Sequence, residues 1–456
     1  MTSHSRRSAR ELATDIVRRL QGAGFAAWWV GGCVRDLRLG REPQDYDIAT
    51  SALPAQIEAL FSRTVPVGRQ FGVVVVVEDG RQFQVATFRA EADYQDGRHP
   101  EQVSFGDAQA DARRRDFTVN GLFFDPIRDV LHDWVGGEAD LRAKIIRTIG
   151  EPEERFAEDH LRLLRAVRFA AQLGFEIAPG TVAALQARAG QIRTVSAERV
   201  REELVKLFRP PHAARGLDLL RVGGLLEQLL PELAATVTCE QSPDFHPEGT
   251  VFNHLRLMLA RMPADAHESL PWAVLLHDVA KPVTATRDPA TGSIHFYGHE
   301  RIGAEMTRAI LERLRFPRKQ TEEITGCVRH HMQFKDAPQM RKATLRRMLL
   351  RPTFPLELEL HRLDCLGSHG RLDVYDLLVA QAEQLARQPA LRPPLLTGHD
   401  LIALGLEPGP ALGALLREVR ERQLQDELTT PAQARQWARQ KIGGAPGAAG
   451  SAESAS

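Results

Sequence analysis

The chain has 456 residues, more than one hydrophobic core usually accommodates, so we expect two or more domains. Apolar residues make up 43% and charged residues 26%, and lysine plus arginine equals aspartate plus glutamate at 59 each, so net charge gives no bulk attraction to nucleic acid. No run of about 18 apolar residues occurs, and the polar start leads into no signal-peptide core. We therefore expect a cytoplasmic protein without membrane contact, in which any RNA binding comes from local clusters of arginine.

The cysteines lie far apart and lack paired metal-ligand spacing: Cys33, Cys239, Cys327 and Cys365. We expect them to be reduced and mostly buried, and we expect no structural zinc site. A disulfide framework is therefore not part of the predicted fold.

Helical and strand patterns alternate in the N-terminal third of the chain. A helix over 9–23 leads into a short apolar strand over 26–30, and a Gly-Gly turn, a second helix and a strand around 45–49 follow. Residues 73–77 are five valines, a pattern typical of a fully buried strand, and residues 82–89 form its hairpin partner across an Asp-Gly turn. These patterns predict a mixed α/β domain.

Strand patterns nearly vanish from about residue 151 onward. Long helical periodicities follow, interrupted by proline-containing segments at 210–211, 243–247, 289–292 and 389–394. The small, polar tail over 443–456 is expected to be disordered. The predicted fold class is α+β, with a mixed sheet and its helices at the N-terminus and all-α segments after it.

A Gly-Gly turn followed by two spaced aspartates forms the first candidate site. Gly31 and Gly32 stand between a predicted strand and a helix, where backbone amides can approach a phosphate closely, and Arg35 lies one turn further on. Asp45 and Asp47 are residues i and i+2 of a predicted strand, so their carboxylates point to one spot and repel unless a cation lies between them. Oxygen-only ligation suits Mg²⁺, and two such ions are the usual device of phosphoryl transfer.

The order of glycine turn, helix and Asp-x-Asp strand resembles the polymerase-beta-like nucleotidyltransferase superfamily. The segments GGCVRD and DYDIATSALP are similar to class II tRNA nucleotidyltransferases and bacterial poly(A) polymerases. The resemblance implies that Gly32 and Arg35 contact the triphosphate and that Asp45 and Asp47 are catalytic and bind Mg²⁺. One departure is Gln84 in QFQVATFR, where the family often carries a glutamate.

An arginine run precedes a second motif of the same family. Residues 113–120, RRRDFTVN, resemble the RRDFT-x-N motif. An arginine run alone is usually a solvated face, but the Asp, Phe and Asn that follow imply contacts with the sugar and phosphate of an incoming nucleotide. Arg115 is the residue that we expect to make them.

The segment AEDHLRLLRAVRFAAQLGF predicts an amphipathic helix. Its polar side carries one aspartate and three arginines at i+3 spacing: Asp159, Arg162, Arg165 and Arg168. A solvated ion-pair face, worth under about 1 kcal/mol, is the alternative interpretation. The segment resembles the family's EDxxR motif, which implies that these side chains bind the nucleotide and that Asp159 and Arg162 match the pairing edge of C or A while excluding G and U.

Histidines and aspartates gather between residues 245 and 370. A lone histidine in a helical protein is more often structural, but a His-Asp dipeptide in the apolar helix of LLHDVAKP is far less ordinary. The segment resembles an HD-domain phosphohydrolase, which binds one or two divalent metals. The implied ligands are His254, His277, Asp278 and Asp364, with His299 and His331 as further candidates. Such ligands suit Mn²⁺, Ni²⁺, Fe²⁺ or Zn²⁺, so the second metal expected here is a transition metal.

Near the C-terminus, LLTGHDLIALGLEPGPALGALL resembles the family segment that supports the tRNA end. Its His399-Asp400 dipeptide follows Thr397 at an expected helix start, where the aspartate is a cap rather than a metal ligand. The resemblance runs from about residue 10 to 442. It implies a nucleotidyltransferase head over 8–150, a helical neck with base-selecting and RNA-binding residues over 151–212, a helical body with the HD site over 213–385, a helical tail over 395–442 and disorder over 443–456.

Three functions fit these motifs. The first is template-independent addition of C, C and A to the 3′ end of tRNA from CTP and ATP, with release of pyrophosphate. The second is poly(A) synthesis, or addition of A alone or CC alone, by the same chemistry. The third is an HD phosphohydrolase with an inactive head. Because Asp45 and Asp47 are both present, an inactive head is disfavoured, whereas the first two functions share all the head motifs. We expect CCA addition, with tRNA, CTP, ATP and Mg²⁺ as the partners and phosphohydrolysis as an additional activity of the HD site.

Overall fold

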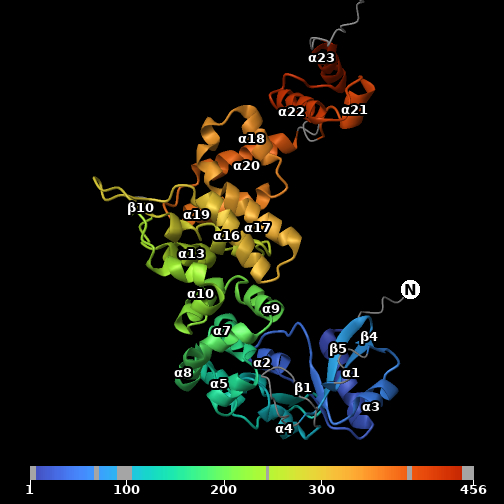
Figure 1. Ribbon diagram of the computed structural model, residues 1–456. Helices are drawn as coiled ribbons and strands as arrows, with labels where there is room; N and C mark the ends of the chain where they lie inside the picture. Colours follow the sequence, from blue (N-terminus) through green and yellow to red (C-terminus); the bar gives the residue numbers. More distant parts are fainter. Residues whose placement is uncertain (1–6, 66–70, 90–104, 243–245, 388–392, 444–456) are drawn as a thin grey trace, which may run out of the picture. The chain divides into compact units, whose positions relative to one another are not determined.

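The computed structural model describes residues 7–65, 71–89, 105–242, 246–387 and 393–443 (Figure 1). The chain forms two compact units. The N-terminal unit comprises Met1–Thr238, Met262–Asp265 and Ala309–Pro317, and the C-terminal unit comprises Cys239–Arg261, Ala266–Arg308 and Arg318–Ser456. The division into five segments that the sequence suggests stays a prediction, and the tail over 444–456 lies outside the described residues.

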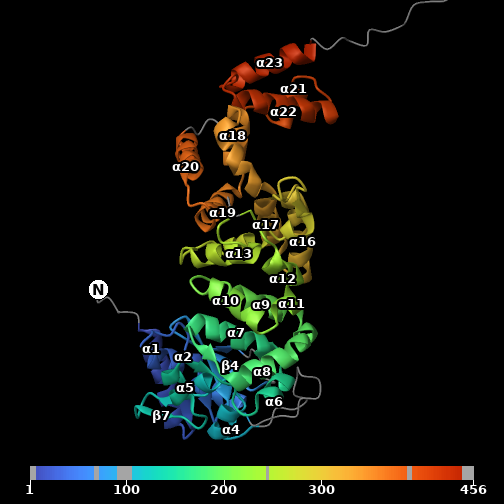
Figure 2. The same ribbon diagram turned by 90° about the vertical axis from the view of Figure 1, so that its left-hand side faces the viewer.

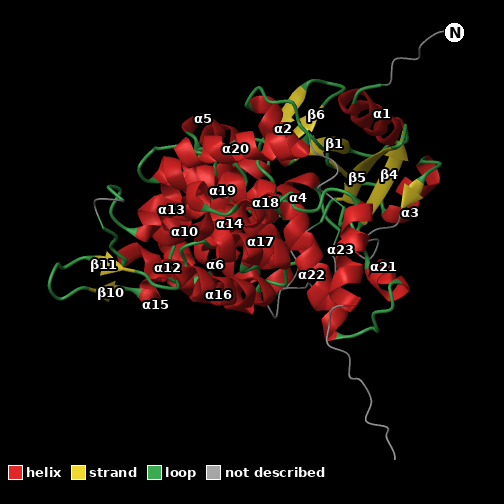
Figure 3. Cartoon of the chain, turned by 90° about the horizontal axis from the view of Figure 1, so that it is seen from above, coloured by secondary structure: helices red, strands yellow, loops and turns green. Residues whose placement is uncertain are grey.

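A seven-stranded mixed sheet is the framework of the N-terminal unit (Figure 3). The strand order is β3-β4-β5-β2-β1-β6-β7, and within this sheet as described β2 and β5 are the one parallel pair. The strands are β1 (Ala27–Val30), β2 (Ile48–Thr50), β3 (Thr64–Val65), β4 (Val73–Glu78), β5 (Arg81–Thr87), β6 (Phe123–Asp125) and β7 (Val130–His132). A separate parallel pair joins β8 (Ile145–Ile146) to β9 (Glu176–Ile177).

The helices of the N-terminal unit surround and extend this sheet. They are α1 (Ala9–Gly22), α2 (Gly32–Arg38), α3 (Pro54–Leu60), α4 (Ala108–Arg113), the 3-10 turn η2 (Thr118–Asn120), α5 (Gly137–Ala143), α6 (Pro152–Glu158), α7 (Leu161–Leu173), α8 (Pro179–Arg188), η3 (Ala189–Thr194), α9 (Ala197–Leu207), α10 (Ala213–Val222), α11 (Leu226–Leu229), α12 (Pro231–Ala234) and η4 (Ala235–Thr238). The amphipathic helix predicted after the Glu-Asp pair is α7, and it packs against α9 and α10 (Figure 2).

Two details of the sheet differ from the sequence-based expectation. First, β2 begins at Ile48, so Asp45 and Asp47 precede the strand instead of lying within it. Second, the valine strand β4 was expected to be fully buried, and this was wrong: Val74 and Val76 are buried, whereas the valines that alternate with them are half-buried. The reason is that α3 packs against β4, while the edge strand beside β4 has only two residues. The hairpin itself is confirmed, with antiparallel pairing of β4 and β5.

Where the structure describes it, the C-terminal unit is helical apart from one short hairpin (Figure 3). Its elements are α13 (Val251–Ala260), α14 (Leu270–Leu276), α15 (Lys281–Thr284), β10 (Thr286–Arg287), β11 (Ile294–His295), α16 (His299–Arg313, whose end belongs to the N-terminal unit), α17 (Arg318–His330), the 3-10 helix η5 (His331–Gln339), α18 (Lys342–Leu349), α19 (Phe354–Gly367), α20 (Asp373–Ala386), α21 (Gly398–Ala403), α22 (Pro410–Leu424) and α23 (Pro431–Gly443). The predicted fold class, a mixed sheet followed by helices, is confirmed.

Helix α14 lies at the centre of the C-terminal unit. Every residue of it is buried, and it packs against α13, α17 and α19. The His-Asp dipeptide directly follows this helix, so both side chains are held in the interior. Further along the chain, α21 begins with a capping box between Thr397 and Asp400, as the sequence predicts for a cap.

The four cysteines are free, and three of them are buried: Cys33, Cys327 and Cys365. This agrees with the expectation of reduced and mostly buried thiols. Within the described residues, none of the helices combines the length and the apolar composition needed to cross a bilayer.

One glycine of the head makes a close packing contact that can be tested. A Cβ atom at Gly137, the first residue of α5, would lie 2.2 Å from the carbonyl oxygen of Thr118. We predict that Gly137→Ala lowers the free energy of unfolding by about 2–4 kcal/mol, because backbone must move to accept the methyl group. Urea denaturation followed by circular dichroism measures this. Gly180→Ala in α8 is the control, since nothing lies within 4 Å of its Cβ position. Equal stability of the two variants would contradict the predicted close contact.

Candidate functional site

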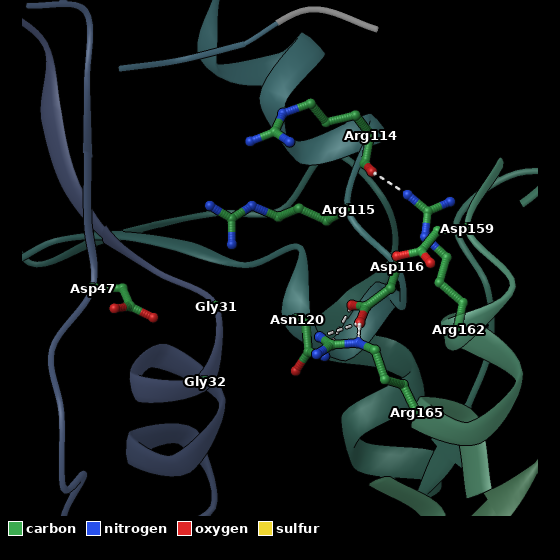
Figure 4. Close-up of a pocket in the computed structure, with 10 residues that line it drawn as sticks. All are labelled: Gly31, Gly32, Asp47, Arg114, Arg115, Asp116, Asn120, Asp159, Arg162 and Arg165. Carbon is green, nitrogen blue, oxygen red and sulfur yellow. Dashed lines mark hydrogen bonds and ion pairs between the residues drawn. The ribbon is translucent and has the colours of Figure 1, made fainter. Parts of the chain in front are cut away.

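An open polar pocket in the N-terminal unit, with a volume of about 360 Å³, collects residues from distant parts of the sequence (Figure 4). They come from the glycine turn before α2, the start of β2, the segment from α4 to η2, and the junction of α6 and α7. The lining residues are Gly31, Gly32, Asp47, Arg114, Arg115, Asp116, Asn120, Asp159, Arg162 and Arg165.

Backbone geometry at the glycine turn leaves no room for a side chain. Gly31 has φ +74°, and a Cβ atom there would lie 3.0 Å from Nη1 of Arg115. Its amide donates to the carbonyl of Leu122 at 3.1 Å, which ties the turn to β6. Glycine is therefore favoured at this position for two reasons: the positive φ of the backbone and the close approach of the Arg115 guanidinium.

The two aspartates stand at the start of β2, where the backbone is fixed by β1. The amide of Val30 donates to the carbonyl of Asp47 at 3.0 Å. Loss of solvent raises the pKa of the Asp47 carboxyl, Arg115 acts in the opposite direction, and the charge of Asp45 raises the pKa further. Two carboxylates that repel each other in this way fit a site for a cation bound through oxygen. Asp47 lines the pocket, whereas Asp45 is not among its described lining residues.

Gln84 stands beside this pair. It precedes Val85 in β5, and Val85 pairs with Ile48, the residue after Asp47. The parallel register therefore brings the exposed, neutral Gln84 beside Asp47.

A buried carboxylate positions the arginine run. Asp111 is 1% exposed and accepts from Nε and Nη2 of Arg115 at 3.2 and 3.0 Å and from Nε of Arg114 at 2.8 Å. Burial acts to raise the pKa of Asp111, but the charges of Arg115 and Arg114 outweigh it and lower the pKa. Asp111 was missed in the sequence, although its i+3 and i+4 spacing to the two arginines within one helical stretch is a usable signal.

A second buried carboxylate joins the motif to α7. Asp116 accepts from Nε of Arg165 at 2.8 Å and from Nδ2 of Asn120 at 3.1 Å, as drawn in Figure 4. The Oδ1 atom of Asn120 accepts from Nη1 of Arg35 at 2.7 Å, and Nε of Arg35 donates to its neighbour Asp36. Arg35 is buried and is not among the described residues that line the pocket, so its contact with a triphosphate stays a prediction.

The structure brings Asp159 and Arg162 to the same pocket wall (Figure 4). Arg162 is held from behind: Nη1 donates to Glu158 at 2.6 Å, and Nη2 donates to the carbonyl of Arg114 at 3.2 Å. Arg168, which the sequence placed with the nucleotide-binding residues, donates to the buried Glu203 of α9 and is not among the described lining residues. A role for Arg168 in nucleotide binding therefore stays a prediction.

The histidine cluster of the C-terminal unit is ordered by backbone carbonyls. Nδ1 of each of three histidines is within hydrogen-bond distance of the carbonyl of the residue three positions earlier: His277 at 2.9 Å, His299 at 2.7 Å and His331 at 2.7 Å. The Nδ1 atom is then the protonated one, and Nε2 offers a lone pair. Such orientation by a second hydrogen bond is typical of histidines that bind metals.

The Nε2 atoms meet around one buried carboxylate. Asp278 is 2% exposed, and its oxygens lie 3.2 Å from Nε2 of His277, 3.4 Å from Nε2 of His299 and 3.7 Å from Nε2 of His331. The Nε2 atoms of His299 and His331 are only 3.1 Å apart. Two lone pairs cannot face each other at that distance without a proton or a cation between them. Lys281 completes the group, with Nζ 2.7 Å from Asp278.

His254 connects this group to two further carboxylates. Its Nδ1 lies 2.7 Å from Glu248, and its Nε2 lies 3.1 Å from Asp364. Burial acts to lower the pKa of His254, but the hydrogen bonds to Asp364 and Glu248 outweigh it and raise the pKa to about 9. All six ligands expected from the sequence therefore lie in one cluster, and Glu248 was missed because it lies in a loop before α13 without a motif.

Comparisons with known proteins place the chain in a family. The chain matches the models of the poly A polymerase head domain over residues 27–147, of a probable RNA and SrmB-binding site of polymerase A over 174–236, and of the HD domain over 249–366. It is 37% identical to an A-adding tRNA nucleotidyltransferase of Deinococcus radiodurans over 435 residues, which are 91% of this chain and 96% of that one. The chain belongs to the tRNA nucleotidyltransferase and poly(A) polymerase family. The resemblance found in the sequence is thereby confirmed.

Two further relatives of the family bear the name CCA-adding enzyme. That of Geobacillus stearothermophilus is 43% identical over 267 residues, and the match spans 58% of this chain and 62% of that one. That of Levilactobacillus brevis is 33% identical, with 90% and 92% covered. Among solved structures, the Bacillus stearothermophilus CCA-adding enzyme in complex with CTP has a TM-score of 0.76 at 28% identity and covers 96% of this chain and 98% of that one.

The glycine turn of this nucleotidyltransferase gives a test of the pocket geometry. We predict that Gly31→Ala weakens binding of CTP, used as the probe, by about tenfold, because the methyl group displaces the Arg115 guanidinium. Isothermal titration calorimetry measures the affinity. Gly24→Ala is the matched control: φ is +88° there, but nothing lies within 4 Å of the Cβ position. Both changes should destabilise the fold by about 1 kcal/mol, and only Gly31→Ala should affect the nucleotide. Equal CTP affinities would contradict the contact.

Proposed function

We propose that this nucleotidyltransferase adds C, C and A to the 3′ end of tRNA, using CTP and ATP and releasing pyrophosphate. The observation that carries the proposal is one pocket lined by a carboxylate of the Asp-x-Asp pair, by the arginine run, and by Asp159 with Arg162. We take the arginines as phosphate-binding groups, Asp47 as a cation ligand, and Asp159 with Arg162 as base-recognising groups, and all of these line the same pocket. A solved relative at 28% identity is called a CCA-adding enzyme and was crystallised in complex with CTP, which supports a nucleotide of this class as the substrate.

Each residue of the proposed catalytic centre has a separate role. Asp45 and Asp47 hold Mg²⁺, which when bound promotes deprotonation of the 3′-hydroxyl and neutralises charge on the leaving pyrophosphate. Arg115 orients the triphosphate, because Asp111 fixes its guanidinium while Nη1 points to the glycine turn. Gly31 and Gly32 allow the phosphates to approach the backbone. We further propose that Gln84 leaves this centre with one carboxylate fewer than relatives that carry glutamate there.

Base selection follows from the fixed chemistry of two side chains. The Asp159 carboxylate only accepts hydrogen bonds, and the Arg162 guanidinium only donates them. Cytosine and adenine each offer an amino donor next to a ring-nitrogen acceptor, which matches this pair. Uracil and guanine offer a carbonyl next to an N–H group, which is the reverse pattern, so their binding would leave the Asp159 carboxylate and the Arg162 guanidinium unpaired. The protein itself is then the template.

Addition of A alone is the second candidate. The Deinococcus radiodurans relative, matched over nearly the whole of both chains, bears the name A-adding tRNA nucleotidyltransferase. The motifs described for the pocket serve both reactions, since adenine and cytosine present the same pattern to Asp159 and Arg162.

For the C-terminal unit we propose a divalent transition-metal centre that hydrolyses phosphate esters. His254, His277, Asp278 and Asp364 form one half of the centre, and His299 and His331 face the other side of Asp278. The 3.1 Å separation of the two Nε2 atoms supports a second ion at that place. A metal ion bound there would activate water and polarise a phosphoryl group. Histidine and carboxylate ligands together favour Mn²⁺, Ni²⁺, Fe²⁺ or Zn²⁺.

Incorporation assays decide between the two transferase candidates. With Mg²⁺, the enzyme is given tRNA transcripts that end before CCA, after the first C or after the second C, with CTP, ATP or both. We expect stepwise addition that stops after one A; addition of A only, or a growing ladder of A, would overturn CCA addition.

Asp45→Ala should reduce incorporation by about 100-fold or more while tRNA binding stays nearly unchanged. Incorporation near the wild-type rate in that variant would refute the metal assignment.

Metal content tests the second centre. In an Asp45→Ala background, which removes the head site, we expect two Mn²⁺ ions per chain after equilibrium dialysis, measured by mass spectrometry. His299→Ala and His331→Ala should each leave one ion, because the second side of Asp278 loses a ligand. His295→Ala in β11 is the control: this histidine stacks on Tyr297 and belongs to no described ligand group. A content of one ion or fewer in the Asp45→Ala background, or two ions retained after His299→Ala, would contradict the dinuclear centre.

A further inference from the structure

The carboxylate that faces the base is held by an arginine outside the pocket. Nη2 of Arg199, in α9, donates to Oδ2 of Asp159 at 3.0 Å and to Oδ1 at 3.3 Å. Oδ1 also accepts from the backbone amide of Leu161 at 3.1 Å, at the start of α7. Asp159 is thus fixed from two sides, by a helix amide and by a guanidinium from another helix.

We infer that Arg199 is a positioning residue that sets the nucleotide preference of this enzyme by fixing the Asp159 carboxylate. The inference rests on the proposed base selection by Asp159 and Arg162. A carboxylate offers about four lone-pair directions. The donors from Arg199 and Leu161 occupy most of them, which leaves Oδ2 with capacity for one further donor. That donor is the amino group of cytosine or adenine.

A fixed acceptor discriminates better than a mobile one. If Asp159 could rotate about its terminal bond, it could turn away from the carbonyl of uracil or guanine and relieve the repulsion that excludes them. It could also follow the N–H group of those bases, which lies one ring position away. Arg199 prevents both movements, so the penalty for the wrong base is retained.

The same geometry predicts a small effect on stability. The side chains of Arg199 and Asp159 are 36% and 27% exposed, and ion pairs of this kind contribute little to folding. Loss of Arg199 should therefore change selectivity in a protein that remains folded. A purely structural role, in the packing of α9 on α7, would instead lower the turnover of every nucleotide alike.

The test is the ratio of kcat/KM values for correct and incorrect nucleotides on tRNA transcripts. For Arg199→Ala we expect KM for CTP and ATP to rise about tenfold and the preference for CTP over UTP, and for ATP over GTP, to fall about tenfold. Arg199→Lys, which keeps the charge and a donor, should recover part of this preference. Arg142→Ala is the control, an arginine of α5 whose side chain is 76% exposed, and should match the wild type.

A double-mutant cycle shows whether Arg199 acts through Asp159. In an Asp159→Ala background, Arg199→Ala should cause no further loss of preference, because the group that it positions is gone. Unchanged nucleotide ratios in Arg199→Ala, or an equal additional loss in the double variant, would overturn the inference. A wild-type enzyme that adds neither C nor A would instead refute the proposed function, so the two failures are distinguishable.

Discussion

The ion pair between the buried carboxylate of Asp116 and the partly exposed Arg165 is the interaction on which the head site depends. Burial acts to raise the pKa of Asp116, but Arg165 and the amide of Asn120 outweigh it and keep the pKa low. Removing Arg165 would leave the Asp116 charge buried without its partner, which destabilises the fold. The pair also joins the segment that positions Arg115 to α7, the helix that carries Arg162. The proposed phosphate-binding and base-recognising side chains therefore keep a fixed separation, which selection by hydrogen bonding requires.

Neutral net charge and an arginine-lined pocket are compatible because the arginines pair with carboxylates, one of which, Asp111, serves both Arg114 and Arg115. Arg115 is paired with Asp111, Arg165 with Asp116 and Arg162 with Glu158. These carboxylates occupy some N–H groups of each guanidinium and so determine which of the others remain for a ligand. A guanidinium carries five N–H donors in a rigid plane. When two of these donors are held by a carboxylate, the directions of the remaining donors are fixed as well. A lysine in the same place would supply charge without this direction.

Whether a contact of the site could be predicted from the sequence depends on how far apart its two residues lie along the chain. The order of glycine turn and aspartate pair, the spacing of Asp159 and Arg162, and the helical segments are local patterns, so their elements were predictable. Asp111 was readable in principle from its helical spacing. The partnership of Arg168 with Glu203 and of Asp159 with Arg199 depends on how α9 packs on α7, and no local pattern encodes it. The half-burial of β4 is likewise a property of its neighbours in the sheet, since five valines look the same in a central strand.

The two candidate metal centres differ in ligand chemistry, and this difference allows both to work in one chain. The head offers carboxylate oxygens only, which suit a hard ion such as Mg²⁺. The cluster of the C-terminal unit combines carboxylates with imidazoles whose Nε2 lone pairs are directed by hydrogen bonds at Nδ1, an arrangement that prefers softer transition ions. Transition ions bind oxygen sites as well, but a site with imidazole ligands in the same molecule binds them more tightly. At limiting supply they would therefore go to the histidine cluster, and Mg²⁺ would occupy the proposed cation site of the head.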